Sequence, residues 1–526
     1  MRSASRIVRR LALIALLGGV AAQPQAAYDV VIRNGRVLDG TGNPWRYADI
    51  AVRGGRIAAM GRLSDAAAQR TIDATGLVVA PGFIDVHSHA GPGLAGELNS
   101  GEPLLAQGIT TAVLNPDGGG PVDLAGQRAG YERRGTGVNT ALMVPHGSIR
   151  QKVLGMADRA PTEGELALMV ELVEAGMKAG GIGLSSGLYY APGSYAKTEE
   201  VIALAKAAAR AGGVYSSHIR DEGDYNIGLV AAVSEVIRIA EEGGLPGIVS
   251  HMKALGKASW GLSVASTMRI EAARARGVEV YADQYPYAAS GTGIGGALVP
   301  RWAQVGGVAE LQKRLHGPER PRLAEEIRVN IERRGGAGSL VISRFRPDPA
   351  IEGKSLEALA AAAGRPAHEV VLDLMERGDA SLISFNMNER DIEHIMRRNY
   401  TMTSTDGDLV PMGVGKPHPR AYGAFPRKLA VYVRERGVVD LAFAIRSMTS
   451  LPASVFAMKD RGLLRPGAWA DIVVFDPEKV RDTATYLEPH QLAQGMIHIL
   501  VNGELVLDGG RFTGKLPGRV VPREHR

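Results

Sequence analysis

Eight strand-like segments, each running into a polar or glycine-containing end, recur through the middle of the chain. In order they are GFIDVHSH, ITTAVLN, NTALMVPHG, GIGLSSG, GVYSSH, GIVSH, VEVYADQY and YTMTSTDG. From one segment end to the next, the first six steps are 26, 31, 41, 31, 33 and 34 residues, and the last is 121. A β-strand with its following helix takes roughly 30 residues, and eight such units close into a (β/α)8 barrel. The spacing therefore predicts an α/β fold of the TIM-barrel type.

The long last step indicates extra structure before the final barrel strand. It exceeds one unit by about 87 residues, which predicts an inserted subdomain at about 288–370. The alternative is an open doubly wound sheet. No Gly-x-Gly-x-x-Gly follows an early strand, so the fingerprint of a dinucleotide-binding sheet is missing.

The two ends of the chain share a sequence pattern that differs from that of the middle. YDVVIRNGRVLDGTG and DIAVRGGRIAAMG near the start, and GAWADIVVFDP and MIHILVNGELVLDGG near the end, are short apolar runs around Gly turns. Each end has too few strands to bury a core alone. We expect 27–80 and 462–526 to form one small β-sandwich domain, from both chain ends, beside a barrel at 81–461.

Residues 1–26 resemble an export signal. MRSASRIVRR is basic and LALIALLGGVAA is apolar but short for a membrane span. Cleavage near Ala22 or Ala26 would leave a periplasmic or secreted protein. The alternative is an uncleaved anchor, and no later stretch is long and apolar enough to cross a membrane.

Composition excludes several classes of protein. The net charge is +6, but four of the 61 basic residues lie in 1–26, which leaves 57 against 55 acidic residues. Bulk charge therefore gives no support for a nucleic-acid partner. The chain has no cysteine, which excludes disulfides, thiolate zinc sites, iron–sulfur clusters and a cysteine nucleophile. Any metal must be held by histidine and carboxylate.

Four histidines lie at predicted strand ends. His87 and His89 are two residues apart, which puts both side chains on one face of a strand. His218 closes GVYSSH and His251 closes GIVSH. The carboxyl ends of barrel strands build the active site. One such histidine would be unremarkable, but four at one barrel mouth predict a metal site.

Asp406 ends the eighth segment, in TSTDGD. Aspartate before glycine is often only a turn residue. At the same mouth as the four histidines, however, its carboxylate is the expected base: it can take a proton from water and return it to a leaving nitrogen.

These motifs carry a family resemblance over about residues 28–515. PGFIDVHSH, SSH, VSH and STDG resemble the amidohydrolase superfamily. GLSSGLYYAPGSYAKTEE, YSSHIRDE, SHMKALGKASWG, DQYPYAAS and KPHPRAYG resemble the N-acyl-D-amino-acid deacylases, or D-aminoacylases. The resemblance implies a zinc-dependent barrel that hydrolyses the amide of a small N-acyl amino acid. It also implies that the metal ligands are His87, His89, His218 and His251, and that the acid/base is Asp406. The substrate α-carboxylate would be bound by Lys253, Tyr285 and Arg420, and Tyr190 would lie near the scissile carbonyl.

One departure from the family concerns the metal. The family has a zinc-ligating cysteine after its second strand, where this chain reads VLNPDGGGP. Asp117 is the nearest substitute, because a carboxylate also binds zinc, although Pro-Asp-Gly is an ordinary turn as well. The number of zinc ions, one or two, stays open.

Other polar residues fit the site less well. Lys257 is expected on the surface, and His146 and Arg150 either line the site or pack its rim. His394, His418 and His498 are interpreted as surface or structural residues. Two other functions stay open: a cyclic amidase or dipeptidase of the same superfamily, and a non-catalytic homologue that only binds a ligand.

Overall fold

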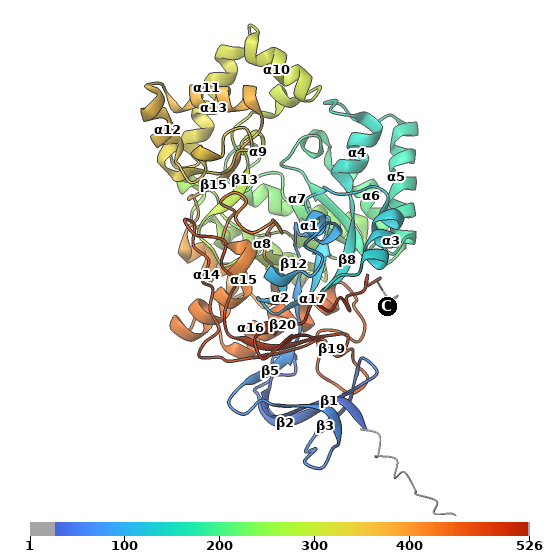
Figure 1. The fold of residues 1–526 in the computed structure, drawn as a ribbon. Helices are drawn as coiled ribbons and strands as arrows, with labels where there is room; N and C mark the ends of the chain where they lie inside the picture. Colours follow the sequence, from blue (N-terminus) through green and yellow to red (C-terminus); the bar gives the residue numbers. More distant parts are fainter. Residues whose placement is uncertain (1–26, 524–526) are drawn as a thin grey trace, which may run out of the picture.

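The computed structural model describes residues 27–523. In Figure 1 a barrel forms the middle, strands from both chain ends lie below it, and a helical insertion stands above it. The signal predicted at 1–26 lies outside the described residues. Among the described residues, no helix has both the length and the apolar character needed to cross a bilayer.

The barrel contains all eight predicted strands. They form one parallel sheet in the order β16-β12-β11-β10-β9-β8-β7-β6. Nearly every residue in them is buried, as expected for strands covered on both faces. Beyond the ends of β6 and β16, the Asp406 N–H donates to His87 O (2.9 Å) and the His89 N–H to Gly407 O (3.0 Å), which closes the ring. The strands are β6 Phe83–Asp85, β7 Ile109–Leu114, β8 Asn139–Pro145, β9 Gly183–Gly187, β10 Val214–His218, β11 Gly247–Val249, β12 Val280–Gln284 and β16 Thr401–Thr403.

Helices between the strands cover the outside of the barrel. Helices α5 to α8 pack against one another in chain order. The interior is filled by an apolar cluster that includes Ile84, Val113 and Met143, and Leu451 and Phe456 of the α17 region join this cluster. The helices outside the insertion are α1 Gly91–Ala95, α2 Glu102–Leu105, α3 Leu124–Arg134, α4 His146–Leu154, α5 Glu163–Lys178, α6 Thr198–Arg210, α7 Leu229–Gly243, α8 Leu262–Ala275, α14 Glu389–Met396, α15 Arg420–Arg427, α16 Leu441–Met448 and α17 Ser450–Val455.

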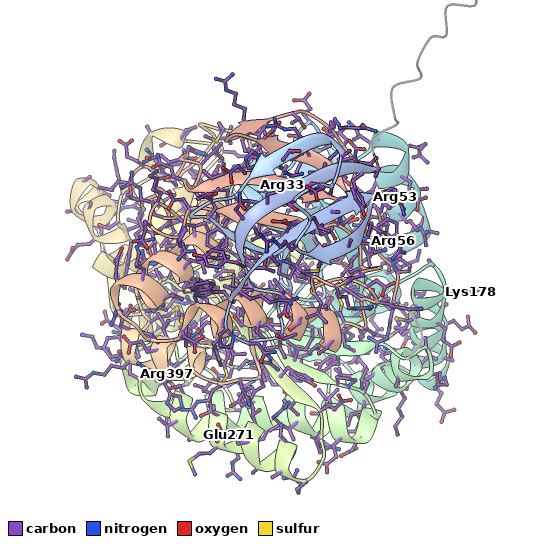
Figure 2. All side chains as sticks on the ribbon, turned by 90° about the horizontal axis from the view of Figure 1, so that it is seen from below. Arg33, Arg53, Arg56, Lys178, Glu271 and Arg397 are labelled. Atoms are coloured by element: carbon purple, nitrogen blue, oxygen red, sulfur yellow. The ribbon has the colours of Figure 1, made fainter. Side chains whose placement is uncertain are left out.

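The two chain ends form one nine-stranded sheet, which confirms the predicted β-domain. Its order is β20-β19-β18-β17-β5-β1-β2-β3, with β4 paired to β1. The antiparallel pair β5–β17 joins the two halves. Arg56, labelled with Arg33 and Arg53 in the view from below (Figure 2), stacks on the Trp469 ring at 4.2 Å. The strands are β1 Tyr28–Val37, β2 Arg46–Arg53, β3 Arg56–Gly61, β4 Ala68–Asp73, β5 Val78–Pro81, β17 Ile472–Phe475, β18 Met496–Val501, β19 Glu504–Asp508 and β20 Arg511–Phe512.

A buried polar cluster fastens the β-domain to the barrel. The Asp471 carboxylate accepts from Asn139 Nδ2 of barrel strand β8 (3.2 Å) and from the Arg461 guanidinium. Asn502 Nδ2 donates to Asn139 Oδ1 (2.8 Å), and the Arg519 N–H donates to the same oxygen (3.1 Å). Every group finds a partner, so the charges are buried without being orphaned.

The insertion before β16 has a core of its own. Its three-stranded antiparallel sheet runs in the order β13-β15-β14, and its apolar cluster lies within residues 294–382. The sequence predicts the insertion at about 288–370, whereas in the structure it continues to β15, because β15 is the central strand of its sheet. The elements are β13 Ser290–Gly293, α9 Ile294–Ala297, α10 Val308–His316, α11 Arg320–Arg333, β14 Leu340–Arg344, α12 Leu356–Ala363, α13 Ala367–Arg377 and β15 Ser381–Ser384.

Lys428, in a π-helical segment at Lys428–Glu435, is buried and makes no ion pair among residues 27–523. Its Nζ donates to Thr403 Oγ1 and Ser447 Oγ, both at 2.8 Å. Burial lowers the pKa of this lysine from near 10.5 to about 7. The unfolded chain therefore binds one more proton than the folded chain between these two pH values, and stability from this group rises with pH in that window.

We expect the difference in unfolding free energy, wild type minus Lys428→Met, to rise from pH 7.5 to 9.5 with a slope approaching about 1.4 kcal/mol per pH unit. Urea unfolding at three pH values measures it. Lys178→Met is the control, because Lys178 is exposed and labelled on the outer side of the molecule in Figure 2. A difference that stays constant with pH contradicts the prediction.

Candidate active site

The four predicted histidines meet at one end of the barrel. His87 and His89 follow β6, His218 ends β10 and His251 follows β11. The ring centroids are 5.5 Å apart for His87 and His89, 4.7 Å for His87 and His251, and 4.5 Å for His218 and His251. All but His89 are buried. The strand ends thus form a compact cluster of imidazoles.

Asp117 lies at the centre of this cluster. Its Oδ1 is 3.3 Å from His87 Nε2, 3.5 Å from His251 Nε2 and 3.8 Å from His218 Nδ1, and its Oδ2 is 3.3 Å from His89 Nε2. The turn after β7 brings it there with a left-handed backbone at Asp117 (φ 56°). Gly118 follows at φ 70°, where a Cβ would lie 2.9 Å from Gly147 N. Asp117 is therefore a turn residue whose carboxylate also lies at the centre of the cluster.

The polar atoms of the cluster fit a metal ion. Both ring nitrogens of His87 and of His218, and Asp117 Oδ1, are buried without a hydrogen-bond partner, which is rare unless another group binds them. Two groups of potential ligand atoms each lie within 4.8 Å of one another, and Asp117 belongs to both: His87, His89, Asp117 and Asp406; and Asp117, His218 and His251. Imidazole and carboxylate are ligands that zinc prefers.

The charges around the cluster favour a cation at its centre. Burial raises the pKa of Asp117, but His87, His251 and His89 hold it well below its usual range. Burial lowers the pKa of His218 to about 3, so its ring is neutral and keeps a lone pair for a metal. The largely buried Asp117 and the buried Asp406 and Glu222 thus place three carboxyl groups around four imidazoles.

Asp406 reaches the cluster from the eighth strand end. Its Oδ1 is 3.5 Å from His87 Nε2 and 3.2 Å from His89 Nε2, and its Oδ2 accepts a hydrogen bond from Arg420 Nη1 at 2.6 Å. Burial raises its pKa, but the charges of Arg420 and His251 take the pKa far below its usual range. The carboxylate is therefore ionised and available to accept a proton.

The four predicted substrate-binding residues line the same cleft, which has a volume of about 800 Å³. The Tyr285 ring has Arg420 Cζ at 4.7 Å from its centroid and Lys253 Nζ at 5.6 Å. Arg420 also donates to Gly291 O of the insertion (3.4 Å). Tyr190 packs against His218 with ring centroids 4.5 Å apart, and its hydroxyl bonds Thr292 Oγ1 (3.1 Å). The two cations and two phenols thus surround the space beside the imidazoles.

Several other polar residues lie away from the cluster. His146 and Arg150 are fully buried against Glu200, with His146 Nε2 2.9 Å and Arg150 Nε 3.2 Å from Glu200 Oε1, and they do not line the cleft. His418 does line it, but its ring bonds backbone groups, Ala289 O and the Arg420 N–H. His394, His498 and Lys257 lie outside the lining residues.

Sequence reasoning missed three carboxylates that hold the site. Asp85 Oδ2 accepts from Thr405 Oγ1 (2.6 Å), and Asp283 Oδ1 accepts from the His251 N–H (2.9 Å). Both precede a predicted site residue by two positions, Asp85 before His87 and Asp283 before Tyr285, so the strand period offered a signal. Glu222, whose Oε1 is 3.0 Å from His251 Nδ1, lies in a loop without strand periodicity, and its only signal is its place at the end of the YSSHIRDE motif.

The geometry makes Asp117→Asn a direct test of the central carboxylate. The amide keeps the shape of the side chain but loses the charge shared between the two groups of ligand atoms, so we expect zinc affinity to fall by more than about 10-fold. Even the loss of a residue that only hydrogen-bonds to a metal ligand usually weakens metal affinity by about that much. Competition with a chromogenic chelator measures it, with Glu97→Gln as the exposed control. Unchanged affinity would leave Asp117 as a turn residue only.

Comparison with known proteins places the chain in a family. The model of the amidohydrolase family matches residues 70–507. The chain is 37% identical to D-aminoacylase of Alcaligenes xylosoxydans xylosoxydans, over 94% of this chain and 98% of that protein, and 36% identical to N-acyl-D-glutamate deacylase of the same organism, over 95% and 98%. The structure of N-acyl-D-glutamate deacylase from Bordetella bronchiseptica, complexed with zinc and a phosphonate inhibitor, superposes with a TM-score of 0.81 at 34% identity, covering 94% of this chain and 99% of that one. The chain therefore belongs to the amidohydrolase family, in the group of the D-aminoacylases.

Proposed function

We propose that this protein is a zinc-dependent hydrolase that cleaves the amide bond of N-acyl-D-amino acids to a carboxylate and a free D-amino acid. The observation that carries the proposal is the Asp117 carboxylate within 3.8 Å of a nitrogen of each of four histidines. The similarity to deacylases over nearly the whole chain supports the substrate class.

The residues proposed to hold one or two zinc ions are His87, His89, His218, His251 and Asp117. Zinc is described in a relative's inhibitor complex, and a binuclear metal centre is described in D-aminoacylase. When bound at such a site, zinc lowers the pKa of water and polarises a carbonyl. Asp117 takes the place that a cysteine has in the family.

Asp406 is proposed as the acid/base. Its Oδ1 faces the imidazoles, while Arg420 Nη1 holds Oδ2 at 2.6 Å and so fixes the direction of the free oxygen. In this role Oδ1 takes a proton from the attacking water and then delivers it to the leaving nitrogen. Arg420 keeps the carboxylate ionised until the proton arrives.

Lys253, Tyr285 and Arg420 are proposed to bind the substrate α-carboxylate. A guanidinium fork and an ammonium together suit a carboxylate, and Tyr285 lies between them. An N-acyl amino acid offers a scissile carbonyl, a carboxylate and a side chain. With the first two held, the third points one way for D and the other way for L, so the site selects one hand.

Export is proposed on the sequence of residues 1–26, with a mature protein outside the cytoplasm. Mass spectrometry of the protein recovered from the cell envelope fraction gives its N-terminus. A start after Ala22 or Ala26 supports the proposal, and an intact N-terminus in the cytoplasm contradicts it.

A screen of N-acetyl-D- and N-acetyl-L-amino acids, with zinc analysis of the same preparation, tests the proposed function. We expect hydrolysis of D-substrates, bound zinc, and at least about 10-fold lower kcat/KM for the L-forms, equivalent to about 1.4 kcal/mol, because the side chain of an L-form points the other way when its carbonyl and carboxylate are held. Faster cleavage of L-forms, or cleavage of cyclic amides or dipeptides only, assigns the protein to a dipeptidase or cyclic amidase instead.

Asp406→Asn separates proton transfer from metal binding. The amide cannot accept the proton, so kcat is expected to fall at least about 100-fold, the low end of general acid–base contributions, while zinc content stays at the wild-type level. The exposed Glu97→Gln serves again as control. Near-normal turnover by Asp406→Asn would show that Asp406 is not the acid/base.

A further inference from the structure

Glu222 is a buried carboxylate that the proposed function leaves without a task. It is 5% exposed. Its Oε1 lies 3.0 Å from His251 Nδ1 and accepts a hydrogen bond from Lys253 Nζ, and its Oε2 lies 3.7 Å from His218 Nε2. These are the ring nitrogens that do not face Asp117. One carboxylate thus stands behind two proposed ligands at once.

The loop that carries Glu222 is held in place by backbone hydrogen bonds. The neighbouring Asp221 carboxylate accepts from three backbone N–H groups, at Gly223 (2.9 Å), Asn226 (2.6 Å) and Gly228 (3.0 Å). The Leu255 N–H donates to Glu222 O (2.8 Å). Both sides of Glu222 are therefore anchored, and its side chain is presented to the histidines before any ligand binds.

The hydrogen-bond chemistry at His251 needs an acceptor at this position. An imidazole that binds a metal through Nε2 carries its hydrogen on Nδ1, which then must donate. The Lys253 ammonium lies 2.6 Å from the same Nδ1, and an ammonium has no acceptor. Two donors face each other, and Glu222 Oε1 is the acceptor that both reach.

The charge of Lys253 also needs compensation. A buried ammonium next to a metal ligand repels a divalent cation, and this repulsion is strong where little water screens it. Glu222 supplies the opposite charge in direct contact.

We propose that Glu222 is a positioning residue that sets which ring nitrogen of His251 faces the metal and cancels the Lys253 charge beside it. The inference rests on the proposed zinc site and adds to it a residue outside the ligand set. Its effect is confined to the group of Asp117, His218 and His251.

Zinc affinity of the purified full-length protein, measured by chelator competition, tests the proposal without any assay of activity. We expect Glu222→Gln to raise the Kd of one zinc equivalent by about 10- to 100-fold, with an unchanged far-UV circular dichroism spectrum. Asp224→Asn is the matched control, since Asp224 is an exposed carboxylate of the same loop, and its Kd should equal that of the wild type.

A second variant separates the two parts of the role. Lys253→Met added to Glu222→Gln removes the uncompensated ammonium, so this double variant should bind zinc at least about threefold more tightly than Glu222→Gln. It should still bind more weakly than Lys253→Met alone, because His251 Nδ1 lacks its carboxylate. If Glu222→Gln does not fold, the comparison of the double variant with Lys253→Met decides the matter, because both lack the ammonium and they differ only in the carboxylate that faces His251 Nδ1.

Three results would overturn the inference. They are a Glu222→Gln Kd within twofold of the wild type, equal weakening by Asp224→Asn, and a double variant that matches Lys253→Met. A wild-type protein that binds no zinc contradicts the proposed function instead, whereas a zinc-binding wild type with an unaffected Glu222→Gln contradicts this inference alone.

Discussion

The site depends on one largely buried carboxylate surrounded by imidazoles. Asp117 Oδ1 and Oδ2 lie 3.3–3.8 Å from nitrogens of four histidines that arrive from three different strands. Burying such a charge is costly unless other groups pair with it. The barrel supplies those groups, because the carboxyl ends of its parallel strands all face the same space. The closed barrel therefore holds the histidines that pair with the Asp117 carboxylate, and the carboxylate in turn holds the histidines together.

The sequence was sufficient to predict the barrel, the joining of the chain ends and the meeting of the histidines. Strand ends about 30 residues apart fix which side chains share a mouth, whatever the loops do. His218 and His251 could thus be placed without knowing any contact. Asp117 could be named only as a substitute, because Pro-Asp-Gly is equally typical of a plain turn, and the left-handed backbone that turns its carboxylate inward is a property of the folded loop.

Other features depend on tertiary contacts that no local pattern carries. The Asp406–Arg420 pair joins residues 14 positions apart across an irregular loop. Strand spacing predicted Asp406 at the barrel mouth and the family resemblance implied Arg420 in the cleft, but neither predicted that the two side chains touch. Glu222 reaches His251 because the loop after β10 is bonded to the segment after β11, through the Leu255 N–H and Glu222 O. The insertion extends past its predicted end because a sheet needs its central strand, β15, and that strand follows the helices in the chain.

The shared sheet at the chain ends bears on how the protein is made. β5 pairs with β17, and Pro81 faces Ile472 across about 390 residues of chain. During synthesis the first strands leave the ribosome long before their neighbour exists, and until then β5 presents an unpaired edge, which is the kind of edge that binds other chains. Contacts of such sequence separation also slow folding. The segment from β17 onward therefore covers the exposed edge of β5, and a chain that stops short of β17 would leave that edge unpaired and open to association with other chains.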